Sequence, residues 1–168
     1  MEKKGKAWKF GDDISTDHIA PGRLFHLRTN LPELAKHVLE DADPDFAKNM
    51  SEGDFVVAGK NFGLGSSREH APVIIKIAGV NGVLAKSFAR IFFRNAINIG
   101  LLVIECNTDL INQGDELEVN LEKGIVKNIT QNIDIKITPL PDVMIKILND
   151  GGLAKHIEKY GDFQLQIV

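Results

Sequence analysis

The chain has 168 residues, of which 43% are hydrophobic and 26% charged, as in an ordinary globular protein with enough residues for a sizeable core. Its formal net charge of −3 gives no general reason to expect a nucleic acid or an anionic membrane as partner. The single cysteine, Cys106, excludes an internal disulfide and suits the cytosol, so we expect a cytoplasmic protein.

The first part of the chain predicts two strands, a long loop and a helix. Residues 5–10 favour a short strand, and residues 11–30 a long polar loop. Residues 31–42 favour a helix with one apolar face, and residues 54–59 a buried strand. A loop as long as residues 11–30 in a compact domain is more often functional than idle.

The middle of the chain alternates helices and strands. Residues 68–79 have helical length, residues 80–87 favour a strand, residues 88–100 a helix capped by Gly100, and residues 101–105 another strand. This alternation predicts an α/β unit with parallel pairing.

The C-terminal third predicts a different arrangement. Residues 115–130 favour a hairpin that turns at residues 122–124, and residues 132–138 a half-buried strand. Residues 141–161 favour two helices separated by a glycine pair. We therefore predict one α/β domain over residues 1–168, with a mixed sheet and C-terminal β-hairpin additions.

The stretch "NFGLGSSREH", residues 61–70, offers several alternatives. Ser66 and Glu69 have the spacing of a capping box, which would make the stretch an ordinary helix start. A Walker loop is excluded because its lysine is missing, a dinucleotide loop because Arg68 replaces the third glycine, and a nucleophile elbow by the serine–glycine spacing. Besides the capping box there remains an anion site of helix-terminal amides, two hydroxyls and Arg68.

The sequence provides no ligand set for a metal. Its five histidines are scattered without the spacing of a zinc site. Because an iron–sulfur cluster typically takes about three or four thiolates, the one cysteine cannot hold a cluster alone. We therefore expect no metal site and no cofactor in this chain.

Three segments together resemble a known family. "GDDISTDHIAPGR", "GKNFGLGSSREHA" and "AKSFARIFFRNAINIGLLVIE" are similar to the small subunits of isopropylmalate dehydratase and homoaconitase, and to the swivelling C-terminal domain of aconitase. The likeness covers about the whole chain with order and spacing preserved. The resemblance implies an aconitase-type swivelling β/β/α domain and a hydro-lyase that isomerises a hydroxy di- or tricarboxylate by dehydration and rehydration.

The resemblance also implies partners. A large subunit would hold a 4Fe–4S cluster that acts as Lewis acid on the substrate hydroxyl, in a heterodimer or heterotetramer with the small subunit. This agrees with the single cysteine. Leucine biosynthesis is the commoner setting in the family.

Site residues follow from the resemblance position by position. Ser66 matches the serine base, Ser67 and Arg68 match neighbouring substrate-binding residues, and Asp17 matches an active-site aspartate. Ala20 replaces a serine found in aconitase, and Leu64 replaces a cysteine common in the family. Neither change removes a group that the implied chemistry uses.

Arg28 bears on the choice of substrate. It falls where aconitase has a substrate-binding arginine, and "HLRT" resembles the "YLRT" loop of homoaconitases. A guanidinium there suits an additional carboxylate, whereas an isopropyl group favours an apolar side chain. The alternatives are an exposed Arg28 that touches no ligand and, for the whole chain, a non-catalytic anion-binding domain.

Other polar residues receive structural roles. We expect His18 and His70 to fix loops through hydrogen bonds, and Asn95 and Asn98 to cap or bridge backbone groups. Arg90 and Arg94, which are four residues apart on one helix face, are expected to pin loops or to meet the large subunit.

Overall fold

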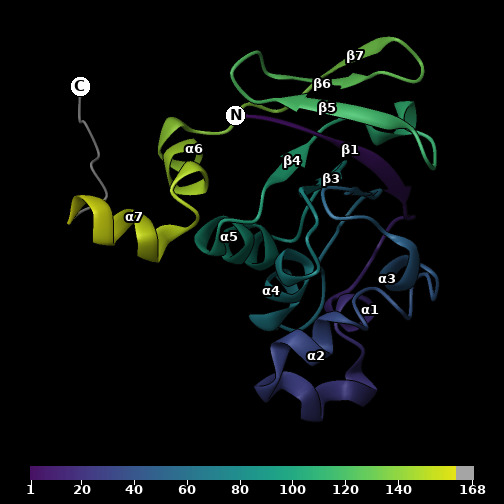
Figure 1. Ribbon diagram of the computed structural model, residues 1–168, viewed down its shortest axis with the longest axis vertical. Coiled ribbons are helices and arrows are strands. Elements are labelled where there is room, and N and C mark those ends of the chain that lie inside the picture. The colour runs from purple at the N-terminus through teal and green to yellow at the C-terminus, as the bar shows by residue number, and fades with distance from the viewer. Residues whose placement is uncertain (162–168) are drawn as a thin grey trace.

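The computed structural model describes residues 1–161 (Figure 1). Its strands are β1 (Glu2–Lys9), β2 (Phe55–Val57), β3 (Gly82–Ala85), β4 (Val103–Glu105), β5 (Glu116–Asn120), β6 (Ile125–Asn128) and β7 (Ile133–Lys136). Its α-helices are α1 (Thr16–Ile19), α2 (Leu31–Ala35), α3 (Phe46–Asn49), α4 (His70–Ile77), α5 (Arg90–Ile99), α6 (Asp142–Asn149) and α7 (Leu153–Tyr160), and two 3-10 helices are η1 (Gly22–Thr29) and η2 (Thr108–Leu110).

Strand β1 joins two halves of one seven-stranded sheet, whose order is β4-β3-β2-β1-β5-β6-β7. Its last residues, Ala7–Lys9, pair in parallel with β2, which continues in parallel to β3 and β4. Its first residues, Glu2–Lys6, pair antiparallel with β5, which continues into β6 and β7. The predicted mixed α/β sheet with a C-terminal hairpin is therefore confirmed.

The two ends of this sheet meet. Just beyond β4 and β7, Cys106 and Ile137 form an antiparallel bridge. The amide of Thr138 adds a hydrogen bond of 2.9 Å to the carbonyl oxygen of Glu105. The sheet therefore curls into a half-barrel, in which the segments just after the end strands β4 and β7 contact each other.

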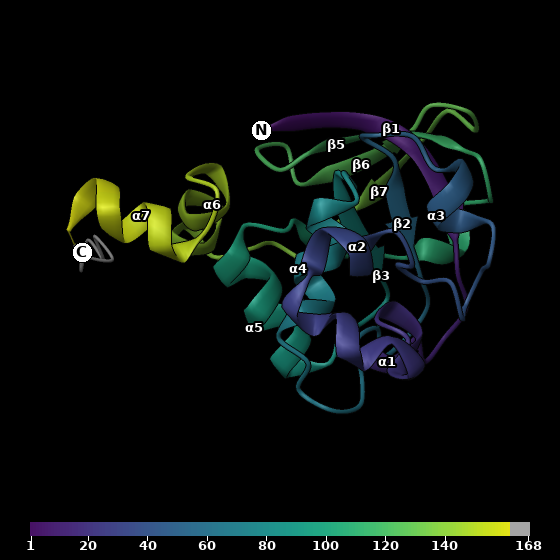
Figure 2. The same ribbon diagram turned by 60° about the horizontal axis from the view of Figure 1, so that its bottom comes forward.

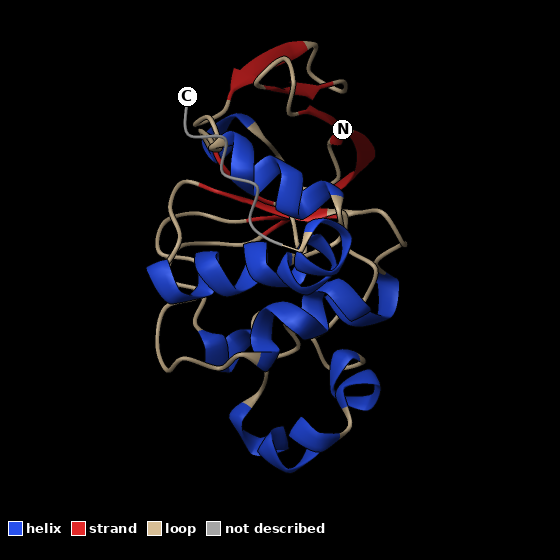
Figure 3. Cartoon of the chain, turned by 90° about the vertical axis from the view of Figure 1, so that its left-hand side faces the viewer, coloured by secondary structure: helices blue, strands red, loops and turns tan. Residues whose placement is uncertain are grey.

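The helices lie mainly on one side of the strands (Figure 3). Helices α4 and α5 contact each other, and α6 and α7 pack against α5 and against one another. Figures 1 and 2 show the α6–α7 pair at the side of the molecule, next to α5. Among residues 1–161, no helix has both the length and the apolar character needed to cross a bilayer.

Phe46 fills the core between the sheet and the N-terminal helices. Its side chain is fully buried, and its ring packs edge-on against Trp8 and Phe10 with centroid distances of 5.4 Å in both cases. Edge-to-face pairs add to the free energy that burial of the rings provides. Phe46 therefore ties α3 to the central strand β1.

We expect Phe46→Ala to lower the free energy of unfolding by about 3–5 kcal/mol, because it leaves a cavity lined by two aromatic rings. Urea unfolding followed by circular dichroism measures this change. Ile157→Ala, at a side chain that is 38% exposed, is the control and should cost about 1 kcal/mol or less. Equal losses in the two variants would contradict the role of Phe46 in the core.

Two predicted elements are wrong. Residues 11–30 are not a long loop, because they contain α1 and η1. The helix predicted over residues 31–42 ends at Ala35 and continues as turns to residue 42. There the amides of His37 and Val38 bond to carbonyls three residues back, and Leu39 has a positive φ of 56°, which an α-helix does not accommodate.

Candidate active site

Three chain segments that follow parallel strands come together at one edge of the sheet. The segment after β1 meets the segment after β2 through a parallel bridge between Ser15 and Leu64, and the segment after β3 joins through a bridge between Phe62 and Phe88. Carboxyl ends of parallel strands lie at the same edge, where α/β proteins place their ligands. The stretch from Asn61 to His70 thus lies against the turn that starts α1.

The backbone conformation and the close packing at position 63 require a glycine. Its φ is +84°, and a Cβ there would lie 2.2 Å from Cγ of Phe92. Gly65, with a φ of +107°, turns the chain again before the two serines. The two glycines therefore let the backbone pass between α5 and α1 and present Ser66 beyond them.

The capping box predicted for Ser66 and Glu69 is wrong. Helix α4 begins at His70, and its N-cap Glu69 has helical backbone angles and makes no side-chain capping hydrogen bond. The Ser66 hydroxyl instead faces Arg68 and Thr16. A capping box does occur in α1, where Ser15 and His18 exchange hydrogen bonds, so the structural role expected of His18 is confirmed.

Ser66 lies at the centre of a small polar network. Its Oγ accepts a hydrogen bond of 3.2 Å from Nε of Arg68, and it lies 3.5 Å from Oγ1 of Thr16. The Thr16 hydroxyl donates to the Ser66 carbonyl oxygen at 3.0 Å. Thr16 is buried, so it fixes the backbone of Ser66 from beneath.

Arg68 connects the serine to the turn after β1. Its guanidinium forms an ion pair with Asp17 and donates a hydrogen bond of 2.9 Å to the Ala20 carbonyl oxygen. The arginine side chain is 19% exposed and the Asp17 side chain is 63% exposed. Polar contacts thus link Ser66, Arg68 and Asp17, three of the five predicted site residues, in one network.

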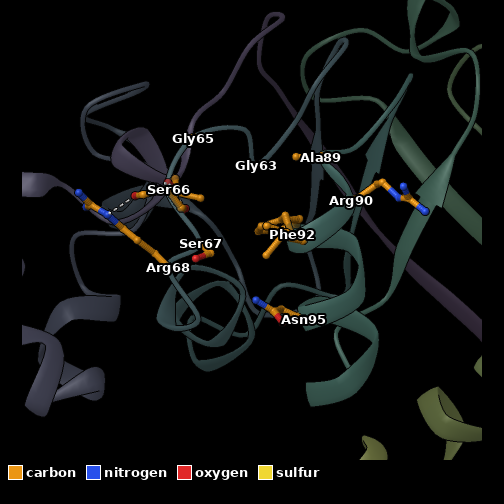
Figure 4. Close-up of a pocket in the computed structure, with 11 residues that line it drawn as sticks. Gly63, Gly65, Ser66, Ser67, Arg68, Ala89, Arg90, Phe92 and Asn95 are labelled. Carbon is orange, nitrogen blue, oxygen red and sulfur yellow. Dashed lines mark hydrogen bonds between the residues drawn. The ribbon is translucent and has the colours of Figure 1, made fainter.

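A cavity of about 380 Å³ opens beside Ser66 (Figure 4). Ser66, Ser67 and Arg68 line one side, and Phe92 and Asn95 of α5 line the other. Within residues 1–161 the Ser67 hydroxyl makes no hydrogen bond to the protein. The cavity volume suits a small carboxylic acid.

Arg28 lies outside this cavity but beside Arg68. Its guanidinium carbon is 4.2 Å from the centroid of the Phe25 ring, and that of Arg68 is 6.0 Å from the same centroid. The His70 ring also faces Phe25, at 6.4 Å. Burial lowers the pKa of His70, and the charges of Arg68 and Arg28 lower it further, which keeps the imidazole neutral near pH 7.

The sequence interpretation missed Thr16 and Phe25. Thr16 stands directly before Asp17 in "GDDISTDHIAPGR", so its position next to a predicted site residue could have indicated a role in the site. Phe25 gave no signal, because an exposed aromatic residue in a presumed loop has no pattern that links it to two arginines. Only the 3-10 helix η1 brings the ring close to them.

Helix α5 contributes polar residues to two pockets. Arg90 lines the cavity beside Ser66, although its side chain points away from Ser66 in Figure 4. Arg90 and Arg94 also line a second groove near Pro139 and Met144. Among the described residues neither arginine forms an ion pair, and the side chains of Asn95 and Asn98 make no hydrogen bond. The expectation that these two asparagines cap or bridge backbone groups is wrong.

Residues 1–161 do not provide a ligand set for an iron–sulfur cluster or a zinc ion. Cys106 is buried, and desolvation raises the pKa of its thiol to about 12, which disfavours the thiolate that a metal requires. Within the described part of the chain no three side chains of His, Cys, Asp or Glu form a metal-binding group. The side chains that this chain contributes to the cavity carry hydroxyl, guanidinium and amide groups.

Comparison with known proteins defines the class of this fold and site. Residues 19–109 match the family described as the aconitase C-terminal domain. "3-isopropylmalate dehydratase small subunit 2" of Archaeoglobus fulgidus is 65% identical over 165 residues, covering 98% of this chain and all of the relative. "3-isopropylmalate dehydratase small subunit 1" of Thermotoga maritima is 63% identical, covering 95% of this chain and 97% of the relative.

A solved structure agrees. The crystal structure of 3-isopropylmalate dehydratase (LeuD) from Methanocaldococcus jannaschii superposes with a TM-score of 0.91 at 46% identity, covering 96% of each chain. The chain therefore belongs to the family of 3-isopropylmalate dehydratase small subunits, which are subunits of hydro-lyases with the aconitase C-terminal fold. The resemblance drawn from the sequence is confirmed.

Proposed function

We propose that the chain is the small subunit of a heteromeric hydro-lyase that isomerises a hydroxy dicarboxylate of the 3-isopropylmalate type by dehydration and rehydration. The observation that carries the proposal is the hydrogen bond from Arg68 to the Ser66 hydroxyl at the wall of a cavity of suitable size. The names of the similar small subunits support the substrate class.

Ser66 is the proposed general base. Dehydration breaks the bond between a proton and the carbon next to a carboxylate, and Ser66 Oγ would receive that proton as an alkoxide. A free serine hydroxyl is a weak base, so its alkoxide needs stabilisation in a site that excludes water. The Nε–H of Arg68 points at Oγ, so one donor is already in place where the negative charge resides. The Thr16 hydroxyl lies 3.5 Å from Oγ and donates its proton to the Ser66 carbonyl oxygen.

Ser67, Arg68 and Asp17 are the proposed substrate-binding residues. The Ser67 hydroxyl lines the cavity and is available to a ligand, and the remaining donors of Arg68 suit a carboxylate. Asp17 holds the guanidinium from the opposite side and fixes its plane. The chain would thus bind and orient the substrate while its serine moves a proton.

The second half of the site would come from a large subunit. The family resemblance implies that this partner holds a 4Fe–4S cluster, which supplies Lewis-acid chemistry at the substrate hydroxyl when it is bound. The term "small subunit" in the names of the relatives supports a heteromeric assembly. We place the complex in the cytoplasm, because that compartment keeps thiols reduced and Cys106 is a free thiol.

Turnover by the assembled complex tests this function. The purified chain is mixed with the large subunit, and absorbance of the unsaturated acid is followed with 3-isopropylmalate as substrate. We expect turnover from the mixture and none from either subunit alone. A complex that assembles but forms no unsaturated acid from any hydroxy di- or tricarboxylate would favour a non-catalytic anion-binding domain.

Arg28 supports a second candidate function, that of a homoaconitase small subunit. Its guanidinium lies over the Phe25 ring and is thereby held on the side where Arg68 and His70 lie. An additional positive charge at this edge suits a substrate with a third carboxylate. The same complex would then act on homocitrate or homoaconitate.

Arg28→Val separates the two candidates. We expect the variant complex to lose kcat/KM for a tricarboxylate by about 10- to 160-fold, the effect of one charge-assisted hydrogen bond, and to change little with 3-isopropylmalate. Steady-state kinetics with both substrates measure the difference. Arg23→Val is the matched control, because Arg23 lies in the same 3-10 helix and pairs with Glu40 and Asp41 instead. Equal losses on both substrates would rule out a role of Arg28 in substrate choice.

A further inference from the structure

Asn95 is a polar residue of the cavity that the proposed function does not use. Asn95 comes from α5, on the side of the cavity across from the serine segment, and Figure 4 shows its side chain pointing toward Ser67. The residue is half-buried, and within residues 1–161 its amide makes no hydrogen bond. A half-buried amide that faces a cavity without a partner is available to a ligand.

The register of α5 explains why Asn95 faces the cavity. Ile91 and Phe92, four and three residues earlier, line the same cavity, so the three side chains share one face of the helix. Asn98, one turn later, is exposed and does not line the cavity. Arg94, directly before Asn95, lines the other groove.

The chemistry of an amide suits the ligand. Arg68 is already paired with Asp17, so a dicarboxylate gains from further hydrogen-bond donors in the cavity, which Arg90 of α5 also lines. The Asn amide offers two donors and an acceptor, and can therefore bind a carboxylate oxygen or a hydroxyl of a hydroxy acid. Ser67 lines the same cavity, so its hydroxyl is a second uncharged group for the same ligand.

We propose that Asn95 is a substrate-binding residue whose side-chain amide, together with the Ser67 hydroxyl, binds a carboxylate of the hydroxy acid from the α5 side of the cavity. This inference rests on the proposed function, because it takes the hydroxy acid as the ligand. Asn95 lies on α5, outside the segment that contains Ser66 and Ser67. Substrate binding would therefore also depend on the position of α5 relative to that segment.

Asn95→Asp in the assembled complex tests the inference. The substitution keeps the size of the side chain but places a carboxylate against the carboxylate of the substrate. We expect KM for 3-isopropylmalate to rise about tenfold or more, with a smaller fall in kcat. Because protonation removes the repulsion, the KM ratio of variant to wild type should shrink as pH falls from about 8 to 5, toward the ordinary pKa of Asp near 4.

Asn98→Asp is the matched control. It makes the same change on the same helix at an exposed position outside the cavity, and should leave KM unchanged. Equal KM values for Asn95→Asp and wild type, or equal shifts in both aspartate variants, would overturn the inference. So would weaker assembly with the large subunit combined with an unchanged KM in the assembled complex, which would assign Asn95 to the subunit interface.

A binding measurement keeps this test separate from the proposed function. Titration calorimetry of the complex with 3-isopropylmalate reads the role of Asn95 even where no turnover occurs. Weaker binding by Asn95→Asp than by Asn98→Asp supports the inference. Equal binding contradicts it. If the wild-type complex showed no turnover, that result would count against the catalytic function and would not bear on the role of Asn95 in binding.

Discussion

Ser66→Ala in the assembled complex is expected to lower kcat by roughly 10²–10⁴-fold, the usual contribution of a positioned general base. The variant removes Oγ, which accepts the hydrogen bond from Arg68. The backbone of residue 66 should stay in place, because the Thr16 hydroxyl donates to its carbonyl oxygen. KM should change less than kcat, since the cavity keeps Ser67 and Asn95. Steady-state kinetics with 3-isopropylmalate measure both constants.

Ser87→Ala is the control for this experiment. The Ser87 hydroxyl accepts a hydrogen bond from the Asn61 amide and does not line the cavity, so kcat should stay close to the wild-type value. Analytical size exclusion shows whether each variant still assembles with the large subunit. Unchanged turnover by an assembled Ser66→Ala complex would refute the assignment of the base.

Arg68→Lys is expected to lower kcat/KM by about 10- to 160-fold for each charge-assisted hydrogen bond that is lost, at about 1.5–3 kcal/mol each. The guanidinium bonds in three directions at once, to Ser66, Asp17 and the Ala20 carbonyl. A lysine ammonium keeps the charge but cannot reproduce this planar arrangement. Both KM and kcat should change, because one side chain orients the substrate and stabilises the alkoxide.

The control for Arg68→Lys is Arg23→Lys, at an arginine that pairs with Glu40 and Asp41 on the surface. This control should keep full activity, since exposed ion pairs contribute little to stability and Arg23 does not line the cavity. If Arg68→Lys retained wild-type kinetics, the charge rather than the geometry of Arg68 would be what the site requires. Thermal unfolding of both variants checks that the fold is intact.

Elements with strong local signals were predictable from the sequence. Helix α5 has a clear amphipathic pattern and ends at Gly100, whose φ of +78° is the left-handed conformation expected of a C-cap glycine. The hairpin of β5 and β6 was also predicted, because alternating side chains lead into a turn with Gly124. In both cases the information lies within one short segment.

Features that depend on distant partners were not predictable. Ser66 and Glu69 have the spacing of a capping box, yet the Ser66 hydroxyl faces Thr16, fifty residues away in sequence, and Arg68. The helix α1 was missed because His18 takes the place that Glu or Gln usually has in a capping box. The position of Asn95 in the cavity depends on the register of α5 against the serine segment, which only the fold determines.

The contact between Cys106 and Ile137 has a consequence for the subunit before it meets a partner. The end strands of an open sheet expose unpaired amides and carbonyls, and such edges can recruit strands from other molecules into aggregates. Here the ends of β4 and β7 are joined through the Cys106–Ile137 bridge and the hydrogen bond from Thr138 to Glu105. At the carboxyl ends of β4 and β7, this contact therefore leaves fewer backbone groups open to strand exchange with neighbouring copies.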